Sequence, residues 1–414
     1  MLTIQTQLCW LVSVLLSEPP AYHRYYLSAD PESGSPAFPF RQFILKLVSR
    51  CNLQCDYCYM FEMADDTWRA KPKIMSMDTV AAVARRIADH VRRHELPTVQ
   101  VILHGGEPLL AGPEYIGGVA SALRNSMDVA IDLRVQTNGT LMSDSMLDIL
   151  CGNDIRVGVS LDGNRQASDR HRRYASGRGS YDAVARSLRR LRERAPHLLA
   201  GILCTVDLRN DPVQTYEALQ EFEPTAVDFL LPHGNWDSPP PGRDPVTEAA
   251  PYGAWLSAVF DHWYAISPQR CQVRMFSEII HVMLGGQAAV ETVGLAPVSL
   301  ITINSDGALE QVDTLRSAYA GAVGTGLNVH THDLNAAITH PAIIARQRGR
   351  DGLSETCQKC SLHRVCGGGL YTHRYRAGTG FMNPSIYCRD LSHLIRHIHR
   401  RVSRDVARLR AGTI

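Results

Sequence analysis

Between residues 42 and 231, short apolar runs alternate with amphipathic segments. The apolar runs have the length of strands, which we expect at 42–48, 99–103, 131–136, 155–161, 199–206 and 226–231. Most of the gaps place apolar residues at helical spacing opposite polar ones, which predicts helices near 77–95, 113–125, 143–151, 180–194 and 213–222. Ser76 is the expected N-cap of the first of these helices. Strands separated by helices require a parallel sheet with right-handed crossovers. An α/β fold is therefore predicted, and six strand-helix units favour a partial (β/α)6 barrel over a closed eight-stranded one.

The pattern changes after residue 231. Residues 233–251 are too rich in proline for a regular element, so we expect a loop that either contacts the substrate or separates two domains. The elements predicted further on are helices near 252–265 and 275–285, a hairpin at 298–312 with Asp306-Gly307 at its turn, and an amphipathic helix at 391–409 whose arginines are solvated.

An apolar run at residues 8–16 precedes these elements. It has no Lys or Arg before it and no small-residue cleavage site after it, and it is too short to span a bilayer. The proline-rich segment at 17–39 that follows is typical of a linker. The predicted division is an extension and linker at 1–38, an α/β core at 39–290, a second domain at 291–395 and a terminal helix at 396–414.

Composition and charge limit the classes of partner. The 414 residues are 45% hydrophobic and 20% charged, which is ordinary for a globular protein, and the formal net charge is only +2. No strong field favours nucleic acid or an anionic membrane, so we expect neither as a partner. Seven of the 11 cysteines fall into two groups with metal-ligand spacing, which predicts a reducing, cytoplasmic compartment rather than disulfides.

The first cysteine group follows the first predicted strand. Cys51, Cys55 and Cys58 have the spacing C-x3-C-x2-C, and three thiolates can hold three corners of a 4Fe-4S cluster while one iron stays open to a small ligand. The alternative is a zinc site or three unrelated thiols, but zinc sites close with a fourth protein ligand at short spacing.

This spacing, with Tyr57 directly before the third cysteine, resembles the signature of radical S-adenosylmethionine (SAM) enzymes. The resemblance implies that the amino and carboxylate groups of SAM fill the open iron. It also gives a role to Gly105, Gly106, Glu107 and Pro108, because in that family a GGEP motif at a strand end holds the methionine amino group. In isolation the same four residues are an ordinary turn.

Polar residues also follow the next two predicted strands. Asn138, Ser160 and Asp162 resemble family positions that line the SAM and substrate cavity. Arg172 matches the arginine of a related motif and can pair with the SAM carboxylate, or it can lie on a solvated face.

The second cysteine group lies near the end of the chain. Cys357, Cys360, Cys366 and Cys388 can close a second 4Fe-4S cluster completely, with a four-cysteine zinc site as the alternative. The pattern resembles the SPASM or twitch-like auxiliary domain of radical SAM peptide-modifying enzymes. The family's further cluster is not expected, because Val312 and Leu370 stand where its cysteines would be.

The segments 40–44, 59–65, 366–378 and 380–388 resemble the FxsB-type radical SAM/SPASM maturases. That resemblance implies reductive cleavage of SAM, supported by an external one-electron reductant, and hydrogen abstraction from a precursor peptide to form a cyclophane cross-link. It also implies that Asp313, next to Val312, takes a proton from the substrate radical; the alternative is an aspartate that caps its own turn. Two other classes stay open, namely a radical SAM enzyme acting on a small metabolite, with or without sulfur insertion, and a non-catalytic iron-sulfur or zinc protein.

Overall fold

The computed structural model describes residues 38–266, 269 and 271–410. Contacts within the chain define two compact units. The described part of the N-terminal unit consists of residues 38–204 and 298–347, and that of the C-terminal unit consists of residues 205–266, 269, 271–297 and 348–410. Of the predicted extension at 1–38, only Phe38 falls within the described residues.

The N-terminal unit is built on a sheet whose strand order is β10-β9-β8-β1-β2-β3-β4-β5. Neighbouring strands from β8 to β5 run parallel, as predicted. The strands that form this parallel part are β1 (Gln42–Val48), β2 (Thr98–Gly105), β3 (Ala130–Thr137), β4 (Arg156–Ser160), β5 (Leu199–Thr205) and β8 (Leu300–Ile303).

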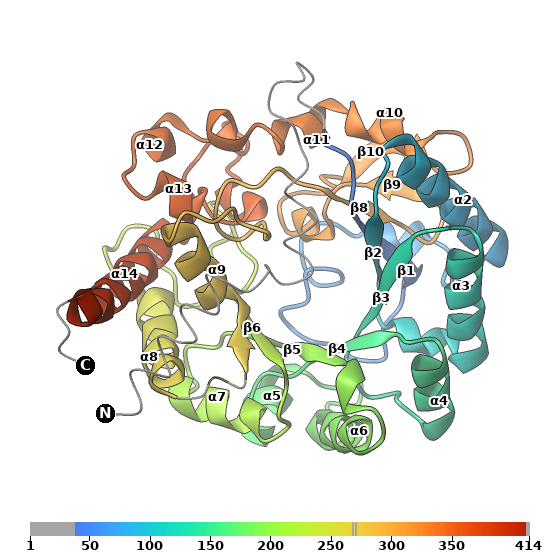
Figure 1. Ribbon diagram of the computed structural model, residues 1–414, viewed down its shortest axis with the longest axis horizontal. Helices are drawn as coiled ribbons and strands as arrows, with labels where there is room; N and C mark the ends of the chain where they lie inside the picture. Colours follow the sequence, from blue (N-terminus) through green and yellow to red (C-terminus); the bar gives the residue numbers. More distant parts are fainter. Residues whose placement is uncertain (1–37, 267–268, 270, 411–414) are drawn as a thin grey trace. The chain divides into compact units, whose positions relative to one another are not determined.

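Helices lie between the strands and pack their apolar stripes on the sheet. Figure 1 shows α2, α3 and α4 along one side of the strands β1 to β4. Ser76 begins α2 by accepting a hydrogen bond from the Thr79 backbone N–H at 3.1 Å, which is the N-cap predicted from the sequence. The helices of this unit are α2 (Met77–Arg93), α3 (Pro113–Asn125), α4 (Asp144–Gly152), α5 (Arg165–His171), α6 (Tyr181–Arg194), α10 (Leu334–Ile338) and α11 (Pro341–Ala345).

The predicted hairpin forms between β8 and β9 (Ala308–Glu310), with Gly307 at φ 81° in its turn. Its first strand, β8, also pairs in parallel with β1, and β10 (Gly324–Asn328) pairs with β9 on the other side. The strand β1 therefore lies inside the sheet, which explains why nearly all of its side chains are buried.

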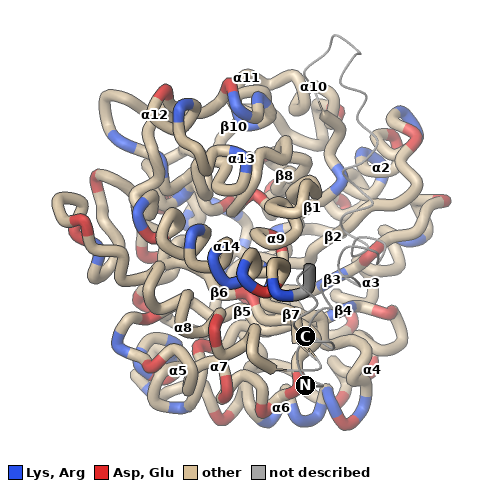
Figure 2. Tube along the Cα trace, turned by 60° about the vertical axis from the view of Figure 1, so that its left-hand side comes forward, with Lys and Arg blue, Asp and Glu red and all other residues tan. Residues whose placement is uncertain are grey.

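The C-terminal unit is mainly helical. The long helix α14 (Cys388–Arg410) packs against α8 (Pro251–Ala265) and α9 (Arg274–Met283), and the blue residues that Figure 2 shows repeated along α14 are all arginines. As predicted, residues 233–250 contain no helix or strand. The unit's other elements are α7 (Pro212–Gln220), β6 (Ala226–Leu230), β7 (Gln272–Val273), α12 (Glu355–Gln358) and α13 (His363–Cys366).

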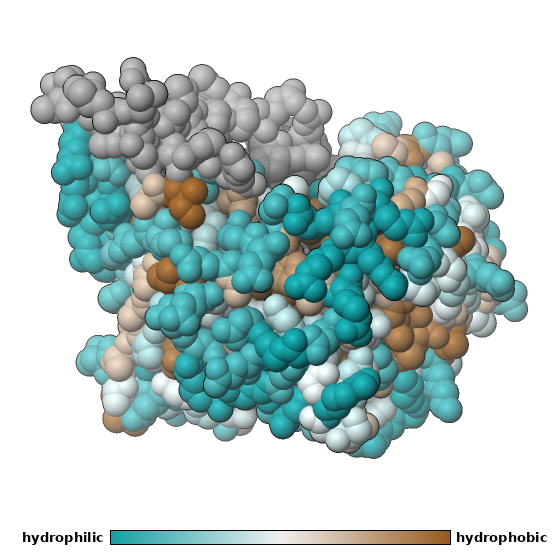
Figure 3. Space-filling view, turned by 90° about the horizontal axis from the view of Figure 1, so that it is seen from below, coloured by the Kyte–Doolittle hydropathy of each residue, from teal (hydrophilic) through white to brown (hydrophobic). Residues whose placement is uncertain are grey.

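The predicted α/β fold with a parallel sheet is confirmed. The domain boundaries proposed from the sequence stay a prediction; residues 298–347, assigned there to the second domain, belong by contacts to the N-terminal unit. Figure 3 shows exposed apolar side chains as separate patches among hydrophilic ones. Among the described residues, none of the helices combines the length and apolar character needed to cross a membrane.

Candidate active site

The first cysteine group lies on the loop after β1, which we call the cluster loop (residues 49–62). Cys51, Cys55 and Cys58 are each partly exposed. The loop folds back through a hydrogen bond from the Cys58 N–H to the Cys55 carbonyl at 3.1 Å, and the Leu53 N–H points at the Cys51 sulfur at 3.4 Å. An N–H group directed at sulfur stabilises a thiolate, so the loop suits thiolate ligands.

Burial raises the pKa of these thiols, that of Cys51 to about 12 and that of Cys55 to about 11. A strong cationic centre is therefore needed to keep them as thiolates, and the irons of a cluster supply one. Among the described residues, no three His, Cys, Asp or Glu side chains are arranged to hold a single metal ion. Ligation of a cluster by these cysteines and the zinc alternative both stay predictions.

The GGEP turn lies against the cluster loop. The Gly106 N–H donates to the Val48 carbonyl at 2.7 Å, and the Glu107 N–H donates to the Arg50 carbonyl at 2.9 Å. A Cβ on Gly105 would lie 2.3 Å from the Val48 oxygen, and one on Gly106 would lie 2.2 Å from the Arg50 oxygen. The two glycines therefore permit the close approach of the end of β2 to the backbone of the cluster loop.

The Glu107 side chain is fully buried and binds the end of β3. Its Oε1 accepts from the Thr137 hydroxyl at 2.7 Å and the Leu109 N–H at 3.0 Å, and its Oε2 accepts from the Asn138 N–H at 2.7 Å. Burial raises its pKa, while these three donors oppose the shift. Glu107 thus fixes the turn that begins at Pro108, and its contact with a methionine amino group stays a prediction.

The next two strand ends carry the other predicted polar residues. The Asn138 amide donates to Asn52 Oδ1 at 2.9 Å and lies 3.7 Å from the Cys51 sulfur. Ser160 accepts a hydrogen bond from the Gln136 amide at 3.0 Å. Asn138 therefore reaches the cluster loop directly, from the carboxyl end of β3.

Tyr57, Asp162 and Arg172 form a chain of hydrogen bonds beside the cluster loop. The Tyr57 hydroxyl donates to Asp162 Oδ2 at 2.5 Å and accepts from Arg172 Nη1 at 2.9 Å. Burial opposes the charge of Arg172, but Tyr57, Cys55 and Asp162 raise its pKa well above its usual value. Arg172 is buried rather than on the solvated face that was the alternative.

Asp313 begins a short 3-10 turn after the hairpin and is almost completely buried. Its Oδ2 binds the Lys46 ammonium group from β1 and accepts from the Tyr59 hydroxyl at 2.8 Å. Its neighbours are therefore β1 and the cluster loop, and no hydrogen bond to the backbone of its own turn is found. This geometry differs from that of an aspartate that caps its own turn.

The charges around Asp313 are closely coupled. Burial alone raises the pKa of the Asp313 carboxyl, but the charge of Lys46 and the hydrogen bonds from Lys46 and Tyr59 lower it well below its usual range. Burial and the adjacent Lys46 lower the pKa of His104 to about 4, so that the ring is neutral. Lys46, Tyr59 and His104 were not singled out from the sequence; a lysine inside an apolar strand was the available signal.

The second cysteine group is brought together in the C-terminal unit. Cys357, Cys360, Cys366 and Cys388 line one cavity, although 21 residues separate the last two. Burial raises the pKa of Cys366 to about 12. Four thiols around one cavity suit a cluster closed by protein ligands, and this ligand set also stays a prediction.

A buried arginine organises the loop beside this cavity. Arg374 donates to the carbonyl groups of Gly367, Gly368 and Gly369 at 2.6, 3.1 and 2.7 Å. All three glycines have positive φ, which a residue with a Cβ rarely adopts. The glycine run after Cys366 therefore serves this tight loop.

Comparison with known proteins agrees with this geometry. Residues 45–218 match the radical SAM superfamily. The cysteine-type anaerobic sulfatase-maturating enzyme of Clostridium perfringens is 23% identical over 367 residues, covering 85% of this chain and 94% of the relative. The serine-type enzyme of Klebsiella pneumoniae is 24% identical over 421 residues, covering 93% and 94%.

Solved structures show the same fold. The structure of anSMEcpe with bound AdoMet has a TM-score of 0.73 and 21% identity, and covers 88% of this chain and 98% of that one. Streptococcus suis SuiB bound to its precursor peptide SuiA has a TM-score of 0.59 and 15% identity, covering 85% and 76%. The match at residues 45–218, together with the fold, places a radical SAM domain in this part of the chain. The two relatives named above, which match most of the chain, are enzymes.

Proposed function

We propose that this enzyme cleaves SAM reductively at a cluster held by Cys51, Cys55 and Cys58 and oxidises a peptide substrate. The observation that carries the proposal is the convergence of the cluster loop, the GGEP turn and the ends of β3 and β4 within one unit. Parallel α/β folds bind ligands at this edge of the sheet. The non-catalytic alternative leaves the buried polar residues of this edge without a role.

When bound, the cluster and SAM supply a 5'-deoxyadenosyl radical that removes a hydrogen atom from an unactivated carbon. The protein's own residues bind SAM and hold the cluster loop in position. Arg172 presents a buried cation suited to the SAM carboxylate, and Asn138 holds the cluster loop in place. The external one-electron reductant supplies the electron for each cleavage.

A peptide is the substrate that the relatives favour. The Clostridium perfringens and Klebsiella pneumoniae relatives are sulfatase-maturating enzymes that match this chain over 94% of their length, and one anSMEcpe structure contains AdoMet and the Cp18Cys peptide. A small metabolite, the other substrate class left open by the sequence, has no comparable support. Among peptide modifications, we propose the cyclophane cross-link implied by the FxsB-type resemblance.

Cross-linking removes two hydrogens from the substrate. One leaves as the abstracted hydrogen atom, and the other leaves as a proton and an electron when the new bond restores a closed shell. Asp313 is the buried carboxylate that can accept this proton. The electron requires an acceptor, and either an external one-electron acceptor or a cluster held by Cys357, Cys360, Cys366 and Cys388 would supply one.

Asp313→Asn tests this role. The variant should stop product formation while leaving deoxyadenosine formation largely intact, because SAM cleavage precedes the proton transfer. Asp306→Asn is the matched control, since Asp306 lies in the same hairpin, is more exposed and pairs with Lys71 at 2.7 Å. Full product yield from Asp313→Asn would contradict the role.

Mass spectrometry of co-incubated candidate peptides identifies the product. A cross-link shows the loss of two hydrogens together with missing fragment ions between the joined residues. A peptide oxidised at a single side chain gives a complete fragment series. That result would show a reaction confined to one residue in place of the proposed cross-link. Deoxyadenosine formation without any change in the peptides, but with a modified metabolite, would overturn the substrate class.

A further inference from the structure

Lys46 is a buried cation in the middle of a strand. Its neighbours in β1 are apolar, and only 1% of the Lys46 side chain is exposed. Its Nζ contacts Asp313 Oδ2, and lies 3.1 Å from His104 Nδ1 and 3.6 Å from Met60 Sδ. Burying an ammonium group costs several kcal/mol unless it is paired, so the pairing requires an explanation.

Both hydrogen-bond donors to the Asp313 carboxylate bind the same oxygen. Lys46 and the Tyr59 hydroxyl both bind Oδ2, and neither donates to Oδ1. Two donors that approach one oxygen from β1 and from the cluster loop fix the rotation of the carboxylate. Oδ1 is therefore the oxygen left to accept a proton from a third group.

His104 does not compete for this role. Its Nδ1 accepts from the Gly105 N–H at 2.7 Å, so the proton of the neutral ring is on Nε2. Among the described residues, the other charged groups that act on Lys46 are Arg316 and Glu310, which bind each other. Arg316 also binds Asp65 at 3.0 Å, and Glu310 lies 3.9 Å from Lys71. Lys46 is the direct cationic partner of Asp313.

We propose that Lys46 is a positioning residue for Asp313. It binds Oδ2, leaves Oδ1 for the substrate proton and keeps the carboxylate ionised until that proton arrives. The inference rests on the proposed function, because it assigns Lys46 to the same proton transfer. In the step itself a C–H bond of the substrate radical breaks, its proton moves to Oδ1, and the electron leaves as described above, while Lys46 stays protonated.

Lys46→Met tests the proposal by removing the charge and keeping the length of the side chain. Without the ammonium group, burial raises the pKa of Asp313, so that a larger fraction of the carboxyl is protonated at a given pH. We expect the ratio of product to deoxyadenosine to fall at least tenfold near neutral pH. Raising the pH should recover part of the product, because it ionises Asp313 again.

Two further variants separate positioning from a structural effect. Lys46→Arg keeps the charge and should restore a substantial part of the product ratio. Lys71→Met is the matched control, because Lys71 belongs to the same unit and pairs with Asp306 at 2.7 Å and with Glu310 at 3.9 Å rather than with Asp313; its product ratio should be that of the unmodified enzyme. A loss in Lys46→Met that neither raised pH nor arginine repairs would overturn the proposal.

Infrared titration gives a readout independent of turnover. The carboxyl C=O band that is absent from Asp313→Asn should appear at a higher pH in Lys46→Met than in the unmodified protein. An unshifted band overturns the inference. Loss of product in Asp313→Asn together with an unaffected Lys46→Met defeats only the role of Lys46, whereas full product from Asp313→Asn defeats the proposed proton transfer itself.

Discussion

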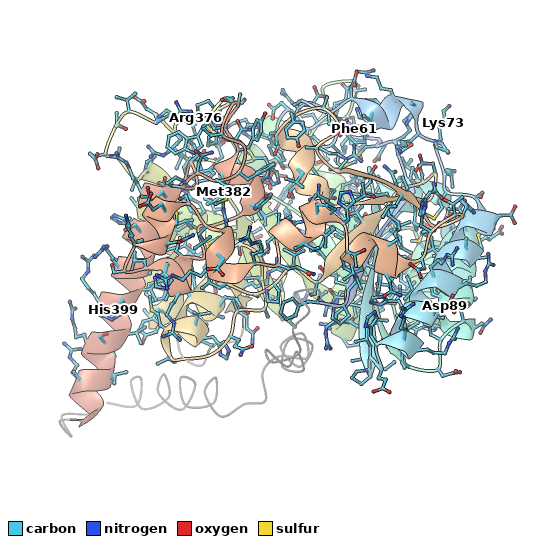
Figure 4. All side chains as sticks on the ribbon, turned by 90° about the horizontal axis from the view of Figure 1, so that it is seen from above. Phe61, Lys73, Asp89, Arg376, Met382 and His399 are labelled. Atoms are coloured by element: carbon cyan, nitrogen blue, oxygen red, sulfur yellow. The ribbon has the colours of Figure 1, made fainter. Side chains whose placement is uncertain are left out.

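Replacing Gly106 by alanine is the most direct test of how the GGEP turn holds the cluster loop. The added Cβ would lie 2.2 Å from the Arg50 carbonyl oxygen, 2.5 Å from its carbon and 2.8 Å from Cζ of Phe61, which is labelled in Figure 4. Two of these atoms are backbone, so a side-chain rotation cannot relieve the clash. The backbone of Arg50, directly before Cys51, has to move.

The size of the effect follows from these contacts. Overpacking costs about 1–3 kcal/mol, and the two backbone hydrogen bonds between the turn and the loop are worth about 0.5–1.5 kcal/mol each. The expected loss is about 2–6 kcal/mol of the free energy of unfolding. Even the lower end lowers the Tm by at least about 4 °C in a unit of this size.

Thermal unfolding of anaerobically prepared protein, combined with iron analysis, measures both consequences. Gly106→Ala should unfold at lower temperature and lose iron from the first cluster. Gly118→Ala is the control, because Gly118 is inside α3 and its added Cβ would meet only Met77 Cε, at 3.6 Å; alanine favours a helix interior by about 1 kcal/mol. If Gly106→Ala kept the unmodified Tm and iron content, the reasoning about this contact would be refuted.

Three further predictions concern the cofactors. Cys58→Ala should abolish deoxyadenosine formation, because two thiolates cannot hold the open cluster; undiminished SAM cleavage would contradict the site. Glu107→Ala should weaken SAM binding in equilibrium binding assays without removing the first cluster; unchanged affinity would count against a contact between Glu107 and SAM. The same variant should destabilise the turn by about 1–3 kcal/mol, because the three donors to Glu107 lose their acceptor. The reconstituted protein should contain about eight irons, and changing both Cys360 and Cys366 to alanine should leave about four with SAM binding preserved. Iron near twelve per chain would overturn the two-cluster assignment.

The sequence alone determined the features that depend on neighbouring residues. The period of apolar positions predicted β1 to β6 and the longer helices between them, but not the short helix α5, and Ser76 indicated where α2 begins. The C-x3-C-x2-C spacing and the GGEP turn were equally readable, because each is formed by adjacent residues on one loop or strand end.

Tertiary structure decided the features that depend on distant residues. The pattern at 298–312 predicted a hairpin, but only the sheet register shows that β8 pairs in parallel with β1. Lys46 and Asp313 are 267 residues apart, and no periodicity relates them. Their contact exists because that register brings the end of the hairpin beside β1 and the cluster loop, and periodicity specifies which face a side chain occupies without specifying which strand lies next to it.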